Sequence, residues 1–131
     1  MVILYSKTHQ WIDTDSGKVG ITPFAAEQLG EISFVDLEGL EDATLEQVKM
    51  DGDEPISDPI DCTVESSKAV GDIYSPVSGK VTGINADLMD EPEKINEDAM
   101  AAWLYIIEAS NLDAEKANLL DEAAYKAFVA K

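Results

Sequence analysis

Residues 60–81 read Ile-Asp-Cys-Thr-Val-Glu-Ser-Ser-Lys-Ala-Val-Gly-Asp-Ile-Tyr-Ser-Pro-Val-Ser-Gly-Lys-Val, and this stretch decides the fold of the chain. Its first five residues alternate between apolar and polar side chains, which is typical of a half-buried strand. Ile73 begins a second apolar segment, which a serine-proline pair and a serine-glycine pair interrupt as turn signals. A strand, a short polar link and a second extended segment predict a β-hairpin with Lys68 at or beside its tip.

Lys68 has two interpretations. A lysine in a turn is most often a solvated charge with no further role. A lysine on a rigid hairpin that projects into solvent is also what a site of covalent attachment requires. The neighbouring residues favour attachment, because Lys68 lies within the sequence Glu65, Ser66, Ser67, Lys68 and Ala69, with Asp72 shortly after it.

This sequence resembles the lipoyl-attachment hairpin of the glycine cleavage system H protein family, in which the lysine carries lipoic acid as an amide. Related hairpins that carry biotin place methionine on both sides of the lysine, whereas Ser67 and Ala69 stand there in this chain. The resemblance therefore implies covalent lipoate on Lys68. It also implies that a lipoate-attaching ligase or transferase recognises the hairpin through Glu65, Ser66, Ser67 and Ala69.

Further segments are similar to the same family in order and nearly in spacing, namely Tyr5 to Trp11, Gly20 to Gly30 and Phe34 to Leu37. The resemblance covers nearly the whole chain apart from residues 38–58. It implies a carrier protein that moves the aminomethyl group of glycine. The implied partners are a glycine decarboxylase, an aminomethyltransferase and a dihydrolipoyl dehydrogenase.

The resemblance also places Thr8, Gln10 and Asp72 beside a cleft that shelters the loaded arm. The family commonly has glutamate where this chain has Gln10, which can offer an amine only a neutral carbonyl. A charge-assisted hydrogen bond is about twice as strong as a neutral one. This departure leaves open an H-like lipoyl carrier for another pathway, such as lipoate relay or sulfur oxidation. An interaction module whose Lys68 is never modified is a third alternative.

Composition limits the classes of partner. The formal net charge is -18, from 27 acidic and 9 basic residues. Such a surface repels nucleic-acid phosphates and anionic membranes, and it favours partners with basic docking faces. Simple solubility, or adaptation to a salty habitat, explains the acidity equally well.

The residue types argue against an enzyme and against a resident metal. His9 is the only histidine and is expected to be structural, and Cys62, the only cysteine, is expected to be a small core residue. No catalytic pair or His/Cys cluster can be assembled from them, so we predict no catalytic residue and no metal ligand. No apolar run approaches the roughly 20 residues of a membrane span. We expect a monomer in the cytoplasm, or in the mitochondrial matrix if the source is eukaryotic.

The expected architecture is one lipoyl-carrier domain over residues 1–131, of the α+β class and dominated by strands. We predict a lipoyl-type barrel-sandwich hybrid. Thr22, Pro23 and Gly30 predict a short capped helix over 22–29, and a four-residue apolar period predicts a C-terminal helix. The acidic segment 38–58 lacks sustained periodicity and is predicted to be an extended loop.

Overall fold

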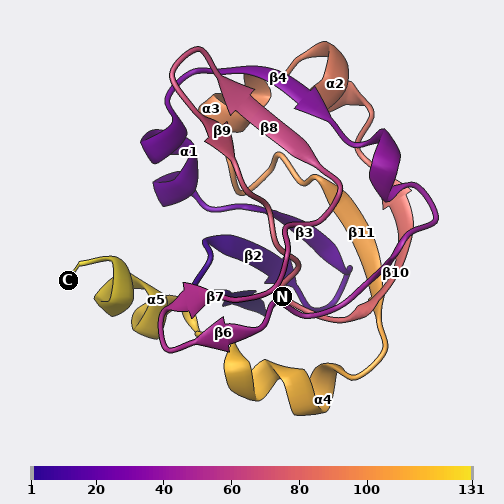
Figure 1. Cartoon of the computed structure of the whole chain (residues 1–131), viewed down its shortest axis with the longest axis vertical. Coiled ribbons are helices and arrows are strands. Elements are labelled where there is room, and N and C mark those ends of the chain that lie inside the picture. Colours follow the sequence, from indigo (N-terminus) through magenta and orange to yellow (C-terminus); the bar gives the residue numbers. More distant parts are fainter. Residues whose placement is uncertain (1, 131) are drawn as a thin grey trace.

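A computed structural model describes residues 2–130 of the chain. Its larger sheet has six strands, each antiparallel to its neighbours (Figure 1). In spatial order these strands are β1 (Ile3–Tyr5), β2 (Gln10–Asp13), β3 (Lys18–Ile21), β11 (Tyr105–Ala109), β10 (Gly79–Ile84) and β5 (Thr44–Leu45). The N-terminal segment therefore forms one edge of this sheet.

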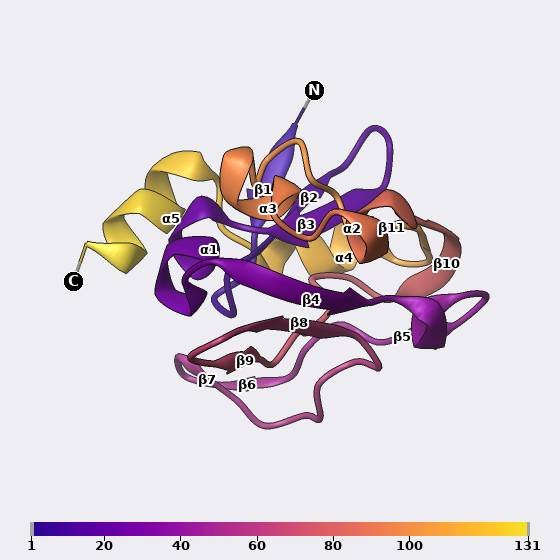
Figure 2. The same cartoon turned by 90° about the horizontal axis from the view of Figure 1, so that it is seen from above.

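A second, three-stranded sheet contains the hairpin. Its antiparallel strands are β4 (Ile32–Asp36), β8 (Thr63–Ser66) and β9 (Val70–Gly71), which lie side by side in Figure 2. Side chains of both sheets, such as Val19 and Val64, meet in one apolar core. The prediction of a strand-dominated α+β barrel-sandwich is confirmed.

Strand β11 holds the centre of the larger sheet, between β3 and β10. The β-prone run that follows Ala102 supplies it, and Leu104 and Tyr105 are fully buried there. The strand β2 was not predicted, because Gln10 to Asp13 carries too few alternations for a period-2 pattern to stand out.

The helices are short and lie around the sheets (Figures 1 and 2). Helix α1 (Pro23–Leu29) is confirmed with its caps, since the Thr22 side chain accepts from the Ala25 amide and Gly30 ends the helix at φ 92°. The C-terminal helix is also confirmed, but it begins only after Asp121. This C-terminal helix is α5 (Glu122–Val129), and the shorter helical pieces before it are α2 (Asp87–Asp90), α3 (Lys94–Glu97), α4 (Leu112–Glu115) and the 3-10 turn η2 (Lys116–Asn118).

Most of segment 38–58 has no regular secondary structure, and a few short elements interrupt it. Leu40 and Leu45 anchor it in the core, and β5 pairs with β10. The rest of the segment holds a 3-10 turn η1 (Glu38–Leu40) and a small hairpin of β6 (Met50–Asp51) and β7 (Glu54–Pro55). Each piece is shorter than one period of a recognisable pattern, which is why the sequence did not reveal it.

No helix between residues 2 and 130 is long and apolar enough to cross a membrane.

Candidate functional site

The hairpin tip is built around the Ser66 hydroxyl. This oxygen accepts from the amides of Lys68 (3.3 Å) and Ala69 (3.2 Å), and it donates to the carbonyl oxygen of Leu29 (2.6 Å). The Ser66 amide donates to the Ala69 carbonyl at 2.8 Å. Ser66 thus closes the turn and fastens it to the end of α1, so its place in the motif has a structural cause.

Lys68 lies exposed at the tip, as predicted, and its side chain passes over Gly30. A Cβ atom on Gly30 would approach the Cε atom of Lys68 to 2.8 Å. Glycine at this helix end therefore serves two needs, because φ is positive there and because any side chain would displace the lysine. A long acyl group on Nζ would extend from this cradle into solvent.

Asn96, in α3, fixes the segment beneath the lysine. Its amide nitrogen donates to the Gly30 carbonyl at 2.9 Å, and its carbonyl oxygen accepts from the Ile32 amide at 2.7 Å. Sequence reasoning missed this residue, because its partners are 64 and 66 positions away. Asn96 and Ser66 together connect the segment beneath Lys68 to α1, α3 and β4.

A cavity of about 330 Å³ lies between α1, β2 and the start of the segment after β9. Thr8, Gln10 and Asp72, the three residues predicted for an arm cleft, all line it. Its other lining residues are His9, Ile21, Phe24, Ala25, Gln28, Leu29, Gly71 and Ile73. Leu29, whose carbonyl holds the hairpin turn, is also part of the cavity wall, so the lysine and the cleft share one support.

Gln10 is only 1% exposed and its amide is already satisfied. Its carbonyl oxygen accepts from the hydroxyls of Thr8 and Ser6, and its amide nitrogen donates to the Thr8 carbonyl at 2.9 Å. Both lone pairs of the amide oxygen therefore have partners within the loop. Asp72 is exposed and is the only carboxylate among the described residues that line the cavity, so it is the counter-ion that this cleft offers to a cation.

A histidine–tyrosine–threonine network supports His9, which lines the cavity, and no sequence motif indicated this network. The Tyr125 hydroxyl lies 2.8 Å from Nδ1 of His9 and 2.7 Å from the Thr22 hydroxyl. The Tyr125 ring stacks on Tyr5 with centroids 4.7 Å apart. Helix α5 thus holds His9, which has a positive φ of 73°, against the cleft.

Removing the Tyr125 hydroxyl should leave His9 and Thr22 without this partner. We expect Tyr125→Phe to lower the free energy of unfolding by about 1–2 kcal/mol, because buried polar groups lose their hydrogen bonds. Urea unfolding followed by circular dichroism measures it. Tyr74→Phe is the control, since no hydrogen bond of the Tyr74 hydroxyl is found within residues 2–130. Equal losses in both variants would contradict a specific role for Tyr125.

Burial lowers the pKa of His9 below its ordinary value of 6.5. The unfolded chain therefore binds a proton more readily than the folded one, and stability must fall as pH decreases through about 6.5 until the folded-state pKa is passed. We expect this decline in urea unfolding measured between pH 8 and pH 5. His9→Asn should remove this component, because asparagine tolerates the positive φ and does not titrate there. An unchanged slope in His9→Asn would contradict the assignment.

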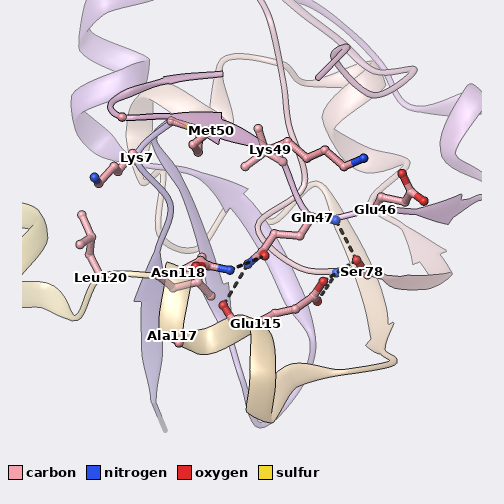
Figure 3. A pocket seen from close by; sticks show the side chains of 13 residues that line it. Lys7, Glu46, Gln47, Lys49, Met50, Ser78, Glu115, Ala117, Asn118 and Leu120 are labelled. Atoms are coloured by element: carbon pink, nitrogen blue, oxygen red, sulfur yellow. Dashed lines mark hydrogen bonds between the residues drawn. The ribbon is translucent and has the colours of Figure 1, made fainter. Parts of the chain in front are cut away.

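A larger groove, of about 740 Å³, lies elsewhere, between residues 46–52 and 115–120 (Figure 3). Its polar groups bind one another. The Glu115 carboxylate accepts from the Ser78 amide and hydroxyl, and Gln47 is hydrogen-bonded to Asn118 and to the Glu115 carbonyl. These hydrogen bonds hold α4 and η2 against Gln47 and Ser78, and the groups that make them are directed at one another and not at a ligand.

Cys62 is half-buried against the core, and the loss of hydration there raises the pKa of its thiol to about 12. A thiol that stays protonated is neither a nucleophile nor a ready metal ligand. Within the described residues, no three His, Cys, Asp or Glu side chains are grouped so that they could hold a metal ion.

The comparisons with known proteins agree with one another. The sequence pattern of the family described as Glycine cleavage H-protein matches residues 3–131. A glycine cleavage system H protein of Acidobacterium capsulatum is 46% identical over 127 residues, which cover 95% of this chain and 89% of that protein. A probable glycine cleavage system H protein of Pyrococcus abyssi is 38% identical, over a match that covers 97% of this chain and 89% of that protein.

The fold agrees as well. The crystal structure of a glycine cleavage system H protein from Mycobacterium marinum superposes with a TM-score of 0.79 at 28% identity, over 98% of this chain and 97% of that one. The family match runs from β1 to the last residue, and it includes both the hairpin and the cleft. The chain therefore belongs to the glycine cleavage H-protein family.

Proposed function

We propose that Lys68 carries lipoate as an amide, and that the chain, as one carrier domain, shuttles the aminomethyl group of glycine between a decarboxylase, an aminomethyltransferase and a dihydrolipoyl dehydrogenase. H proteins are lipoyl carriers and not enzymes, so the chain acts by presenting its arm to enzymes. The observation that carries the proposal is the placement of an exposed lysine on a braced hairpin whose support, Leu29, also lines a cleft.

The residues present fit a lipoyl group. The bare Gly30 leaves room for the base of the arm, and nothing on the hairpin competes for the Lys68 amine among the described ion pairs. When bound, lipoate supplies a dithiol–disulfide couple that accepts the one-carbon unit and two electrons. Tethering it to a rigid hairpin gives the reactive sulfur an effective concentration of order mM at each docked enzyme.

The chain's own residues would then protect the cargo. Asp72 offers a carboxylate to a protonated amine at the end of the arm, and Phe24 and Ile73 restrict water around it. The hydroxyl of Thr8 is held by Gln10, so the polar side of the cleft is preorganised. Release requires only that the arm leave this open cavity when an enzyme competes for it.

Reconstitution tests the proposal. The protein is lipoylated with a ligase, lipoate and ATP, and is then incubated with glycine decarboxylase, glycine and labelled bicarbonate. We expect label to enter glycine only with the lipoylated protein. A lipoylated protein that fails to support this exchange, under conditions in which another H protein does, would contradict the glycine cleavage assignment.

One observation favours a second candidate, an H-like lipoyl carrier for lipoate relay or sulfur oxidation. The Gln10 amide is neutral and internally satisfied, so the cleft binds a cation through Asp72 alone. A lipoylated protein that is inactive with the decarboxylase but donates its lipoyl group to another lipoyl domain, or accepts sulfur, would establish this alternative.

A further inference from the structure

His9 is the only histidine of the chain, and its side chain lines the arm cleft, the cavity between α1 and β2. Among the described residues that line this cleft, His9 and Asp72 alone can titrate. A neutral imidazole has a lone pair on one ring nitrogen and a hydrogen on the other. The effect of His9 on a bound amine therefore depends on which of the two nitrogens carries the hydrogen.

The His9 ring is placed by contacts from two helices. Its centroid lies 4.8 Å from that of Phe24 in α1 and 6.0 Å from that of Phe128 in α5. The His9 carbonyl accepts from the Thr22 amide at 3.0 Å, which fixes the backbone. Nδ1 lies 2.8 Å from the Tyr125 hydroxyl. Nε2 has no hydrogen-bond partner within residues 2–130, so it is the nitrogen left to face the cleft.

Thr22 fixes the direction of the hydrogen bonds that reach Nδ1. Thr22 is 0% exposed, and its hydroxyl oxygen accepts from the Ala25 amide at 3.2 Å. The only other partner of this hydroxyl within residues 2–130 is the Tyr125 hydroxyl, 2.7 Å away. Thr22 therefore donates to Tyr125, and Tyr125 donates its own hydrogen to Nδ1 of His9. The reverse direction would leave the Thr22 hydrogen buried without an acceptor, which is unfavourable.

Nδ1 is consequently the acceptor nitrogen, and the neutral His9 ring carries its hydrogen on Nε2. Burial lowers the pKa of His9 below 6.5, which helps to keep the ring uncharged. The charged side chains of the two helices are engaged elsewhere. Glu27, the one charged residue of α1, lines a different cavity, and Glu122 and Lys126 of α5 pair with each other at 3.0 Å.

The position of this hydrogen matters for an amine whose carbon is bonded to sulfur. A protonated amine has no lone pair, so the carbon–sulfur bond stays intact. If a base takes one proton from it, the nitrogen lone pair forms a C=N bond, the C–S bond breaks, and its electrons leave on sulfur. Water then converts the released one-carbon unit to formaldehyde and ammonium. An imidazole lone pair that faced the cleft could act as this base, whereas an Nε2–H group cannot.

We propose that Tyr125 and Thr22 are positioning residues of the carrier, which hold Nδ1 of His9 as an acceptor so that no imidazole lone pair faces the loaded amine. This inference rests on the proposed function, because the cargo that it protects is the aminomethyl group. Asp72 remains as the counter-ion of the amine. The C-terminal helix, none of whose described residues lines the cleft, thereby takes part in retaining the cargo.

Nitrogen NMR of the isotope-labelled, unmodified protein tests the tautomer without any lipoate. His9 is the only histidine, so one pair of imidazole nitrogens is observed, and a nitrogen with a hydrogen is well separated in shift from one with a lone pair. At pH 8 we expect the lone pair on Nδ1 and the hydrogen on Nε2. In Tyr125→Phe, Nδ1 loses its donor, and we expect the Nδ1–H form to become populated.

Release of formaldehyde from the loaded protein tests the protection. The lipoylated protein is loaded with glycine and a decarboxylase and is then separated from that enzyme. We expect Tyr125→Phe to release formaldehyde about tenfold faster, since a positioned base contributes on the order of 10²–10⁴-fold and only the minor tautomer supplies it. In a His9→Asn background, Tyr125→Phe should leave the rate unchanged, because no imidazole remains.

The matched control is Tyr5→Phe. Tyr5 stacks on Tyr125 with centroids 4.7 Å apart and is 7% exposed, but its hydroxyl makes no hydrogen bond within residues 2–130. Its removal therefore alters the same aromatic cluster and leaves the hydrogen bonds to His9 in place. We expect Tyr5→Phe to keep the Nε2–H tautomer and the wild-type rate of release.

The outcomes separate this inference from the proposed function. A wild-type protein that cannot be loaded overturns both. A loaded wild type whose His9 carries its hydrogen on Nδ1 overturns the inference alone, as do equal release rates in Tyr125→Phe and Tyr5→Phe. Faster release that persists in His9→Asn also overturns it, because Tyr125 would then act on the fold and not through His9. Thermal melts identify a variant that misfolds, and the wild-type tautomer decides in that case.

Discussion

Lys68→Arg is expected to abolish carrier activity completely. Arginine preserves the charge, the approximate length and the exposed position at the hairpin tip. Its guanidinium stays protonated at all working pH values and cannot attack an acyl donor, so no amide forms. The expected result is no glycine-dependent bicarbonate exchange above background, with an unfolding free energy equal to that of the wild type.

The matched control is Lys80→Arg. Lys80 is an exposed lysine in β10, outside the hairpin, and its replacement should leave exchange at the wild-type rate. Bicarbonate exchange and urea unfolding are measured on all three proteins after identical treatment with ligase, lipoate and ATP. Residual exchange by Lys68→Arg would mean that another lysine carries the arm.

Gln10→Glu is expected to have two effects of opposite sign. In the unloaded protein, the new carboxylate would replace an amide nitrogen that donates to the Thr8 carbonyl at 2.9 Å. Two oxygens would then face each other at a position that is 1% exposed. We expect the free energy of unfolding to fall by about 1–3 kcal/mol, the cost of a buried unsatisfied polar group.

The same carboxylate would add a negative charge to the wall of the loaded cleft, which Gln10 lines. It would add a second counter-ion to Asp72, and a charge-assisted hydrogen bond is about twice as strong as a neutral one. We expect the loaded arm to leave the cleft about tenfold more slowly, since about 1.4 kcal/mol corresponds to a factor of ten. The rate of loss of labelled amine from the loaded protein measures this retention.

The pH dependence of the free energy of unfolding provides a further check on Gln10→Glu. Near the Thr8 carbonyl, the introduced carboxyl group would favour its protonated form, whose hydroxyl can donate as the amide does. A carboxyl whose pKa is raised by folding contributes stability at low pH that is lost as pH rises. The deficit of Gln10→Glu should therefore be larger at pH 8 than at pH 5.

The control for Gln10→Glu is Gln28→Glu, at an exposed position of the same cleft. It adds the same charge without burying it, so it should show neither the loss of stability nor its dependence on pH. If Gln10→Glu and the wild type had equal free energies of unfolding and retained the loaded arm equally, the Gln10 side chain would have no role in either property.

Local signals explain which parts of the molecule the sequence predicted. Helix α1 follows from Thr22, Pro23 and Gly30, which act within one turn of the ends of the helix. The hairpin follows from alternation in β8 and from the polar link around Lys68. Such signals require no knowledge of the rest of the chain. The helix and the hairpin that they predicted are both present in the structure.

The supports of the site are non-local and were not predicted. Asn96 and Tyr125 act on Gly30 and His9 from distant segments, and neither residue type nor spacing distinguishes them from solvated side chains. The buried state of Gln10 is a similar case. The motif placed it beside the cleft, but only the fold shows that its amide points to Thr8 and Ser6.

Mass spectrometry decides whether Lys68 is a site of lipoylation. The purified protein is incubated with a lipoate ligase, lipoate and ATP, and its intact mass and proteolytic peptides are measured. We expect one lipoyl group per chain, located on the peptide that contains Lys68. An unmodified protein, under conditions that lipoylate another H protein, or a lipoyl group on a different lysine, would contradict this expectation.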